Sequence, residues 1–265
     1  MTGFRSAGVF ALAFAASAGA AAAQDWTGFY VGVALGAKIT DARWTTELVG
    51  DPPFPAGALD ATNPHRFVPA GLRVGGYLGY DWQVAPRWTA GIEGDFAWSN
   101  AKSALAGVPG CVILCFPDAP GPGVTSTAVR AKWDGSVRGR LGFVAAPALR
   151  IYGTAGVAFQ RLEATAACSN TLSDPVCLVS PPFAVKSQTR STTRVGWTLG
   201  GGLEWRVAPH WLLRGEYRYA DFGTWRGAFF EGEPSAGPGS DTVRFKLRTR
   251  THIAGIGITY AFDWR

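Results

Sequence analysis

The four cysteines are the residues of this sequence whose spacing points most directly to covalent or metal chemistry. They fall in two close pairs, Cys111 with Cys115 and Cys168 with Cys177. An even number of cysteines in an exported chain favours disulfides. A zinc site would need histidines or further thiols at ligand spacing, and no histidine is adjacent to either pair. We predict disulfides, no metal and no cofactor; nearest-neighbour pairing is the simplest of the three connectivities.

The three histidines, His65, His210 and His252, are the residues that could support acid–base catalysis. We expect them in a loop, in a turn and in the last strand. The sequence does not assemble a serine, a histidine and an acid around any of them. The glycine-rich stretches do not lie between a strand and a helix, as a nucleotide-binding loop requires. We predict that the protein is not an enzyme.

Charged residues at alternate positions are the third chemical feature. In six segments, acids and arginines share one parity, and aliphatic and aromatic residues share the other. Enclosed charges of both signs should form ion-pair networks, because an unpaired buried charge is expensive. The residues predicted to form such an interior network are Arg73, Asp81, Glu93, Asp95, Asp134, Arg138, Arg140, Arg150, Arg194, Glu204, Arg206, Arg214, Glu216 and Arg218.

The elements that carry these charges alternate with the period of a β-strand. In residues 194–207, every odd position is apolar or glycine, and every charge is at an even position. This strand has 14 residues, whereas a globular strand has ~5–6 and a tilted strand crosses a bilayer with ~9–11. The same pattern, softer in the first and last segments, is found in residues 27–37, 72–84, 88–98, 133–145, 149–160, 211–219 and 245–262. Eight strands, an even number, predict an all-β fold: an eight-stranded antiparallel up-and-down transmembrane β-barrel.

The connections between these strands alternate between short and long. The short ones contain Pro86, Pro147 and Pro209, placed where the strand ladder needs no donor. The long ones, rich in Pro, Gly, Ser and Thr, are predicted at 38–71, 101–132, 164–193 and 222–244 and contain all four cysteines. Short periplasmic turns and long outer loops are typical of outer-membrane barrels. We predict periplasmic termini and extracellular long loops.

The amino terminus resembles a secretory signal. Arg5 is followed by an apolar run that ends in three alanines at 21–23, which is typical of a cleaved signal peptide. An uncleaved membrane anchor is the alternative, because the run approaches spanning length. We predict a signal peptide at 1–23 and one barrel domain at 24–265.

Aromatic residues of the apolar parity gather at the two ends of the strands. Aromatic side chains are enriched at the two membrane–water interfaces, so two such belts indicate a membrane-spanning barrel. The six patterned strands also carry no charge on the apolar parity, where contact with lipid would make a charge costly. The ten residues predicted at the interfaces are Trp82, Trp88, Phe143, Trp205 and Trp211 beside the short turns, and Trp98, Trp133, Phe159, Trp197 and Tyr219 toward the long loops. The alternative is a soluble periplasmic barrel that binds a ligand, with the apolar parity inside.

Several segments resemble the alphaproteobacterial outer-membrane immunogenic proteins, a small porin-like family related to OmpA-like eight-stranded barrels. They are W-T-G-F-Y-V-G at 26–32, G-I-E-G-D-F at 91–96, V-R-G-R-L-G-F at 137–143, Y-G-T-A-G-V-A-F at 152–159, G-W-T-L-G-G-G-L-E-W at 196–205 and R-G-E-Y-R-Y-A-D-F-G at 214–223. The resemblance implies an outer-membrane location and a structural or surface role without a defined chemistry. It also implies recognition by the barrel-assembly machinery through a terminal aromatic residue. Tyr260 and Phe262 keep that pattern, but Asp263, Trp264 and Arg265 follow.

An eight-stranded barrel is only wide enough for its own side chains to fill it. We predict a mostly plugged, charged interior, for which inward glycines make room. The alternatives are a narrow passive pore for ions or small solutes and, because some small barrels modify lipids, an enzyme. The glycines predicted to point inward are Gly75, Gly79, Gly142, Gly156, Gly196, Gly200 and Gly202.

The partners predicted are outer-membrane lipid and lipopolysaccharide, with the barrel a monomer. Nucleic acid is not expected, because the net charge of +6 comes from scattered basic residues. Cations near the loop side could bind lipopolysaccharide phosphates or form a solvated rim. They are Lys38, Arg43, Lys102, Arg130, Lys132, Arg161, Lys186, Arg190, Arg226, Arg244 and Lys246.

Overall fold

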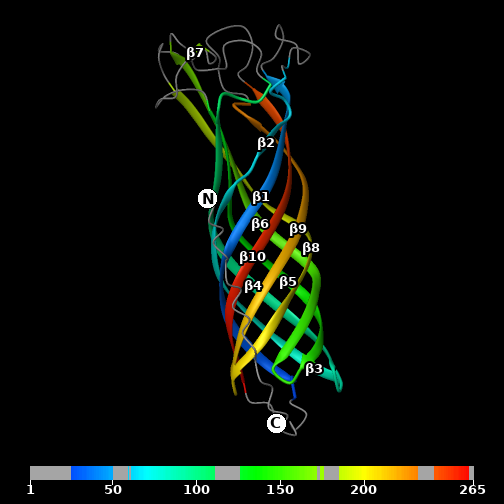
Figure 1. Ribbon diagram of the computed structural model, residues 1–265. Helices are drawn as coiled ribbons and strands as arrows, with labels where there is room; N and C mark the ends of the chain where they lie inside the picture. The colour runs from blue at the N-terminus through cyan, green and yellow to red at the C-terminus, as the bar shows by residue number, and fades with distance from the viewer. Residues whose placement is uncertain are drawn as a thin grey trace, which may run out of the picture.

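The computed structural model shows one antiparallel sheet rolled into a closed barrel (Figure 1). It describes residues 25–49, 59, 61–110, 126–171, 174–175, 185–231 and 242–262. Within these residues, eight long strands each pair with the next along the chain, and the last pairs with the first. No helix in these ranges is long and apolar enough to cross a membrane.

The long strands have 16 to 24 residues. They are β1 (Gly28–Val49), β3 (Ala70–Ala85), β4 (Trp88–Ala106), β5 (Ser126–Ala146), β6 (Leu149–Thr171), β8 (Val185–Ala208), β9 (Trp211–Phe229) and β10 (Val243–Ala261). The short β2 (His65–Phe67) pairs with β1, and the short β7 (Asp174–Pro175) pairs with β6. The predicted all-β, up-and-down barrel is confirmed.

Three two-residue turns join strands at the lower end of the barrel in Figure 1, which we call the turn end. They contain Pro86, Pro147 and Pro209, as the sequence predicts. A turn backbone also accepts from a neighbouring strand: Val144 N donates to Arg87 O at 2.8 Å, and Ala261 N donates to His210 O at 2.8 Å. The opposite end, where the connections are long, is the loop end.

The predicted bounds of the long connections, 38–71, 101–132, 164–193 and 222–244, are too wide. β-Structure continues to Val49, Ala106, Thr171 and Phe229, and it starts again at or before His65, Ser126, Val185 and Val243. In β1, β4, β6 and β9 the apolar alternation that predicts the strand ends about halfway along it. The strands continue because their backbone ladder does not depend on which face is apolar.

The half of the barrel next to the turn end, the lower half, is apolar outside. Its outward side chains form a continuous apolar band, in which Val33, Leu78 and Leu199 are 61%, 63% and 57% exposed. Side chains of the other parity point inward and are mostly charged or tyrosine, such as Glu93 and Arg138. Apolar outside and polar inside is the pattern of a transmembrane barrel.

The half next to the loop end, the upper half, has the opposite pattern. Trp44, Phe67, Phe229 and Phe245 are fully or almost fully buried inside it and form what we call the upper core. The rings of Trp44 and Phe245 stack at 4.3 Å, and those of Phe229 and Phe245 at 5.0 Å. Outward side chains at this height include many charged residues, for example Arg43. This half therefore has the interior and the surface of a water-soluble protein.

Bulges in β5 and β9 help to exchange the apolar and polar faces of the sheet between the lower and the upper half. In β9 the register shifts opposite Arg248–Arg250, where Gly223 has φ +66°. The extra residue turns the strand over, so that Tyr217 points outward, whereas Phe229, of the same parity, points inward. β5 shifts in the same way between Ala131 and Asp134. In β1, β6 and β10 the strand is not turned over. Instead, the apolar residues occupy the outward positions in the lower half and the inward positions in the upper half.

Candidate functional site

The interior of the lower half contains an ion-pair network in three tiers. The tier nearest the turn end joins Asp81, Arg140, Arg150 and Glu204, which come from β3, β5, β6 and β8. Arg150 pairs with Asp81 at 2.7 Å and with Glu204. Arg140 reaches Glu204 at 2.8 Å. Each carboxylate therefore has two guanidinium partners or more, and none of the four groups is a lone buried charge.

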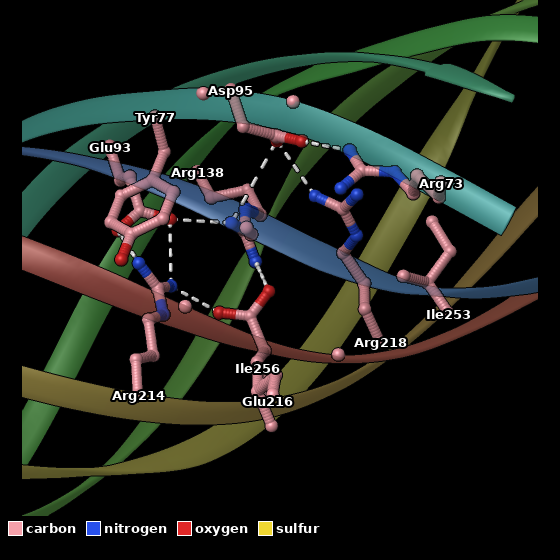
Figure 2. A pocket seen from close by; sticks show the side chains of 15 residues that line it. Arg73, Tyr77, Glu93, Asp95, Arg138, Arg214, Glu216, Arg218, Ile253 and Ile256 are labelled. Atoms are coloured by element: carbon pink, nitrogen blue, oxygen red, sulfur yellow. Dashed lines mark hydrogen bonds and ion pairs between the residues drawn. The ribbon is translucent and has the colours of Figure 1, made fainter.

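The middle tier is centred on Glu93 of β4 (Figure 2). Glu93 pairs with Arg138 at 2.5 Å and with Arg214 at 2.6 Å, and it accepts a hydrogen bond from Tyr30 at 2.9 Å. Arg138 and Arg214 also both pair with Glu216. Two carboxylates are thus bridged by two arginines, Arg138 of β5 and Arg214 of β9.

The tier nearest the loop end joins Arg73, Asp95, Asp134, Arg218 and Lys38. Arg73 pairs with Asp95 at 2.5 Å and with Asp134 at 2.7 Å, and Arg218 pairs with Asp95 at 2.7 Å (Figure 2). Lys38 pairs with Asp134 at 2.8 Å and is fully buried. The tier carries three cations against two carboxylates, so its charges are close to balanced.

The prediction that Lys38 lies on the loop-side rim is wrong. Lys38 is on the inward parity of β1, and its ammonium group ends inside the barrel. The sequence contains the signal for this position, because the outward residues of 27–37 are odd-numbered. The predicted loop includes residue 38 because the predicted strand ends at residue 37, whereas β1 continues to Val49.

The structure brings twelve of the fourteen residues predicted for the interior network into these tiers, each with at least one ion pair. The other two, Arg194 and Arg206, lie apart from the tiers. Arg194 donates to the carbonyl of Thr224 at 3.1 Å near the upper half. Arg206 lies over the ring of Trp26 at 4.5 Å near the turn end.

Trp26 closes the turn end of the network, a role the sequence reading missed. It is fully buried, with the guanidinium of Arg150 over its ring at 4.6 Å in addition to that of Arg206. Its backbone N–H donates to the Gln83 side chain at 2.8 Å. Trp26 is even-numbered, like the inward residues of β1. The alternation of β1, extended a few residues toward the amino terminus, therefore predicts that Trp26 points inward.

Three tyrosines, Tyr30, Tyr77 and Tyr152, fill the space between the arginines and the barrel wall. A methyl group added at Gly202 would collide with the ring of Tyr152, and one at Gly79 would collide with Tyr30. The Tyr152 hydroxyl donates to Glu216 at 2.9 Å and accepts from Arg214 at 2.6 Å. The inward glycines therefore make room for tyrosines as well as for arginines.

A small cavity remains beside the middle and loop-side tiers (Figure 2). Its volume is about 40 Å³, and its lining includes Arg73, Asp95, Arg218, Gly75 and Gly255. A cavity of this size holds only a few water molecules. It is far smaller than the ~300–1,000 Å³ typical of a small-molecule site.

The ten predicted interface aromatics are on the outer surface of the lower half. At the turn end, Trp82, Trp88, Trp205 and Trp211 are 43–49% exposed, and Phe143 packs on Trp88 at 5.2 Å. Toward the loop end, Trp98 and Trp197 are 65% and 54% exposed. Trp133, Phe159 and Tyr219 are partly exposed beside them. The apolar band thus has an aromatic border at each end.

The remaining groups that could do chemistry lie apart from the network. His65 packs on Phe67, Nδ1 of His210 is 3.1 Å from the carbonyl of Ala261, and His252 is on the outer surface. No three His, Cys, Asp or Glu side chains in the described ranges are arranged to hold a metal ion. The disulfide prediction falls outside the described residues for Cys111, Cys115 and Cys177, and the side chain of Cys168 is not described either.

A closed antiparallel barrel with an apolar outer band, aromatic borders and a charged interior defines the class of outer-membrane β-barrel proteins. The chain belongs to the outer membrane protein beta-barrel domain family, whose profile matches residues 8–262.

Relatives with known names agree with this family. The chain is 32% identical over 212 residues to a 31 kDa outer-membrane immunogenic protein of Brucella melitensis, with 75% of this chain and 72% of the relative covered. It is 27% identical over 236 residues to a 25 kDa outer-membrane immunogenic protein of the same organism, with 89% and 80% covered. Among solved structures, it is similar to the outer membrane protein OprG from Pseudomonas aeruginosa, with a TM-score of 0.48, 12% identity and 90% and 99% of the chains covered.

Proposed function

We propose that this outer-membrane barrel is a structural surface protein with a plugged interior, which carries its long loops away from the membrane and has no enzymatic activity. The observation that carries the proposal is the filling of the interior at every height of the described barrel. Trp26 lies at the turn end, the three ion-pair tiers lie above it, and the upper core with Trp44 and Phe245 lies above them.

The upper core supports a plugged interior more strongly than the ion pairs do. Ion pairs can exchange partners and admit water, whereas stacked rings packed on one another exclude it. Segments next to the long connections add to this closure. Asn63 exchanges hydrogen bonds with the backbone of Thr46 at 2.9 and 3.0 Å, and Gly107–Gly110 are buried.

The length of the strands supports a role in raising the loops. β8 has 24 residues, whereas about ten residues of a tilted strand span a bilayer. The upper half, polar outside and apolar inside, is built to stand in water. We propose that the loop end faces the outside of the cell, and that the turn end and both termini face the periplasm.

Planar-bilayer recording of the purified protein tests the plug. We expect no reproducible single-channel steps from the wild-type barrel. Discrete steps would instead support the narrow passive pore, for which the cavity of about 40 Å³ beside Arg73 and Arg218 would be part of the pathway. Trp44→Ala combined with Phe245→Ala, which empties the upper core, is the comparison: steps only in this variant would identify the core as the seal.

Further parts of the proposal concern maturation and partners. We propose cleavage after Ala23, disulfides among the four cysteines, assembly as a monomer by the barrel-assembly machinery, and contact of the rim with lipopolysaccharide. The intact mass of the exported protein, with and without reductant and thiol alkylation, tests the first two. A mass that includes residues 1–23, or four alkylated thiols without reductant, would contradict them.

A further inference from the structure

Three arginines form a row across the outer surface of the upper half. Arg43 of β1 is directly opposite Arg248 of β10 on one side and Arg66 of β2 on the other. The side chains of Arg248 and Arg66 are 54% and 62% exposed, and Arg43 is exposed between them. Like charges directly opposite one another destabilise a sheet. The row therefore favours an anion that several of its members can share.

The acids nearby neutralise this row only in part. Arg66 makes a bidentate pair with Asp41 at 2.9 and 3.0 Å. Arg248 is 3.5 Å from Asp221, and it shares this carboxylate with Arg250. Arg43, in the middle of the row, has no hydrogen-bond or ion-pair partner among the described residues. The positive charge is thus concentrated where the three strands meet.

Directly below the row, Asp41 of β1 is opposite Arg250 of β10, and below this pair the surface becomes aromatic and then aliphatic. His252 of β10 makes a hydrogen bond with the Tyr217 hydroxyl at 2.7 Å, and its ring packs on Tyr219 at 5.2 Å. Ile39, directly opposite His252, is 45% exposed. His252 and Arg248 are four positions apart, or ~13 Å along a strand. The basic row therefore lies just beyond the edge of the apolar band.

We propose that this face binds the phosphorylated glucosamine headgroup of the outer-leaflet glycolipid, the lipid A part of lipopolysaccharide. Arg43, Arg248 and Arg66 hold a phosphate group, the sugar lies on the rings of His252 and Tyr219, and the acyl chains descend over Ile39. Arginine suits this role because its planar guanidinium binds phosphate with two parallel hydrogen bonds. The proposal rests on the proposed orientation, in which the loop end faces the outer leaflet.

A pair of exposed cations on the nearby strands β4 and β5 provides a matched control. There Lys102 of β4 is directly opposite Arg130 of β5, and both are exposed. That row ends on an acid, because Arg130 is in turn opposite Glu163, which also pairs with Lys132 at 2.9 Å. Both sites carry exposed cations on the outer surface, but only the first is an uninterrupted row of guanidinium groups.

The experiment measures binding of purified lipid A bisphosphate to the folded full-length protein in neutral detergent by native mass spectrometry. Variant R43Q/R248Q removes two cations from the row, and K102Q/R130Q removes two from the control site.

We expect R43Q/R248Q to bind about 30-fold more weakly, because each basic group near an anionic lipid contributes about a factor of five. K102Q/R130Q should differ from wild type by less than about threefold. Dephosphorylated lipid A should bind all three proteins equally weakly.

Other outcomes would overturn the proposal. Equal losses in the two variants would show that rim charge in general, and not this row, attracts the lipid. Equal binding of phosphatidylglycerol, or competition by millimolar inorganic phosphate, would show a nonspecific anion surface.

The heat-dependent gel shift confirms that each variant is folded, and R43Q/R248Q should fold as well as wild type because it relieves repulsion. The assay depends neither on conductance nor on orientation in the cell, so its failure is distinguishable from failure of the proposed function.

Discussion

The two halves of the barrel are built from the same strands but for opposite surroundings. In the lower half, Leu78 and Val33 face outward and Glu93 and Arg138 lie inside. In the upper half, Arg43 faces outward, and Phe245 is fully buried inside. The backbone ladder is continuous through both halves. The same backbone ladder therefore accepts an apolar face on either side of the barrel wall, and side chains alone adapt each height to lipid or to water.

The interior of the lower half depends on charge balance. Replacement of Glu93 by Ala leaves Arg138, Arg214 and Arg140 without their shared carboxylate. We expect a loss of about 3–5 kcal/mol in the free energy of unfolding, because the remaining charges stay buried. Urea unfolding in phospholipid vesicles, followed by the gel shift, measures it. Asp221→Asn, at a solvent-exposed cluster, should cost less than about 1 kcal/mol; equal losses would contradict a buried network.

The interior of the upper half depends on ring packing. Phe245→Ala should destabilise that half by about 3–5 kcal/mol, because Phe245 stacks between Trp44 and Phe229. Limited proteolysis should then cut the upper parts of the strands and leave the lower half intact. Phe29→Ala, at a residue 63% exposed on the apolar band, is the control and should not change the cleavage pattern. Uniform cleavage of both halves would show that they do not differ in what holds them together.

The outer surfaces should respond in opposite ways to a new charge. Leu78→Arg puts a cation in the middle of the apolar band, where lipid should cost about 2–4 kcal/mol. Ala104→Arg puts the same cation at an exposed outward position of the upper half of β4, and we expect a change of less than about 0.5 kcal/mol. Vesicle unfolding experiments compare the two. A similar cost at both positions would mean that the membrane covers more of the strands than the apolar band.

The bulge in β9 is the smallest feature that separates the halves. Gly223→Ala places a side chain at φ +66°, which should cost about 1–2 kcal/mol. Gly215→Ala is the matched control in the same strand, because its added methyl group would meet only the Leu203 side chain at 3.8 Å. We expect the control to unfold like wild type. If both variants were equally stable, the left-handed residue would not be what turns β9 over.

The sequence predicts the lower half well and the upper half poorly, for a physical reason. Strict alternation in 194–207 reveals a strand because lipid requires one wholly apolar face. Above the apolar band, small, polar and charged residues such as those at 185–194 can face water on one side without any regular pattern on the other. The bulge in β9 and the change of apolar parity in β1 conceal which residues point inward, so the sequence does not assign Phe229 and Trp44 to a common core.

Alternation and turn chemistry are local properties of the chain. The sequence therefore predicts the class of fold, the turns that contain Pro86, Pro147 and Pro209, and which charges point inward. The tertiary structure alone shows which acid meets which arginine, that Trp44 and Phe229 share one core, and that Arg43, Arg66 and Arg248 lie side by side. These contacts depend on the register in which the closed sheet pairs its strands. Register is a property of the whole ring, and no single strand encodes it.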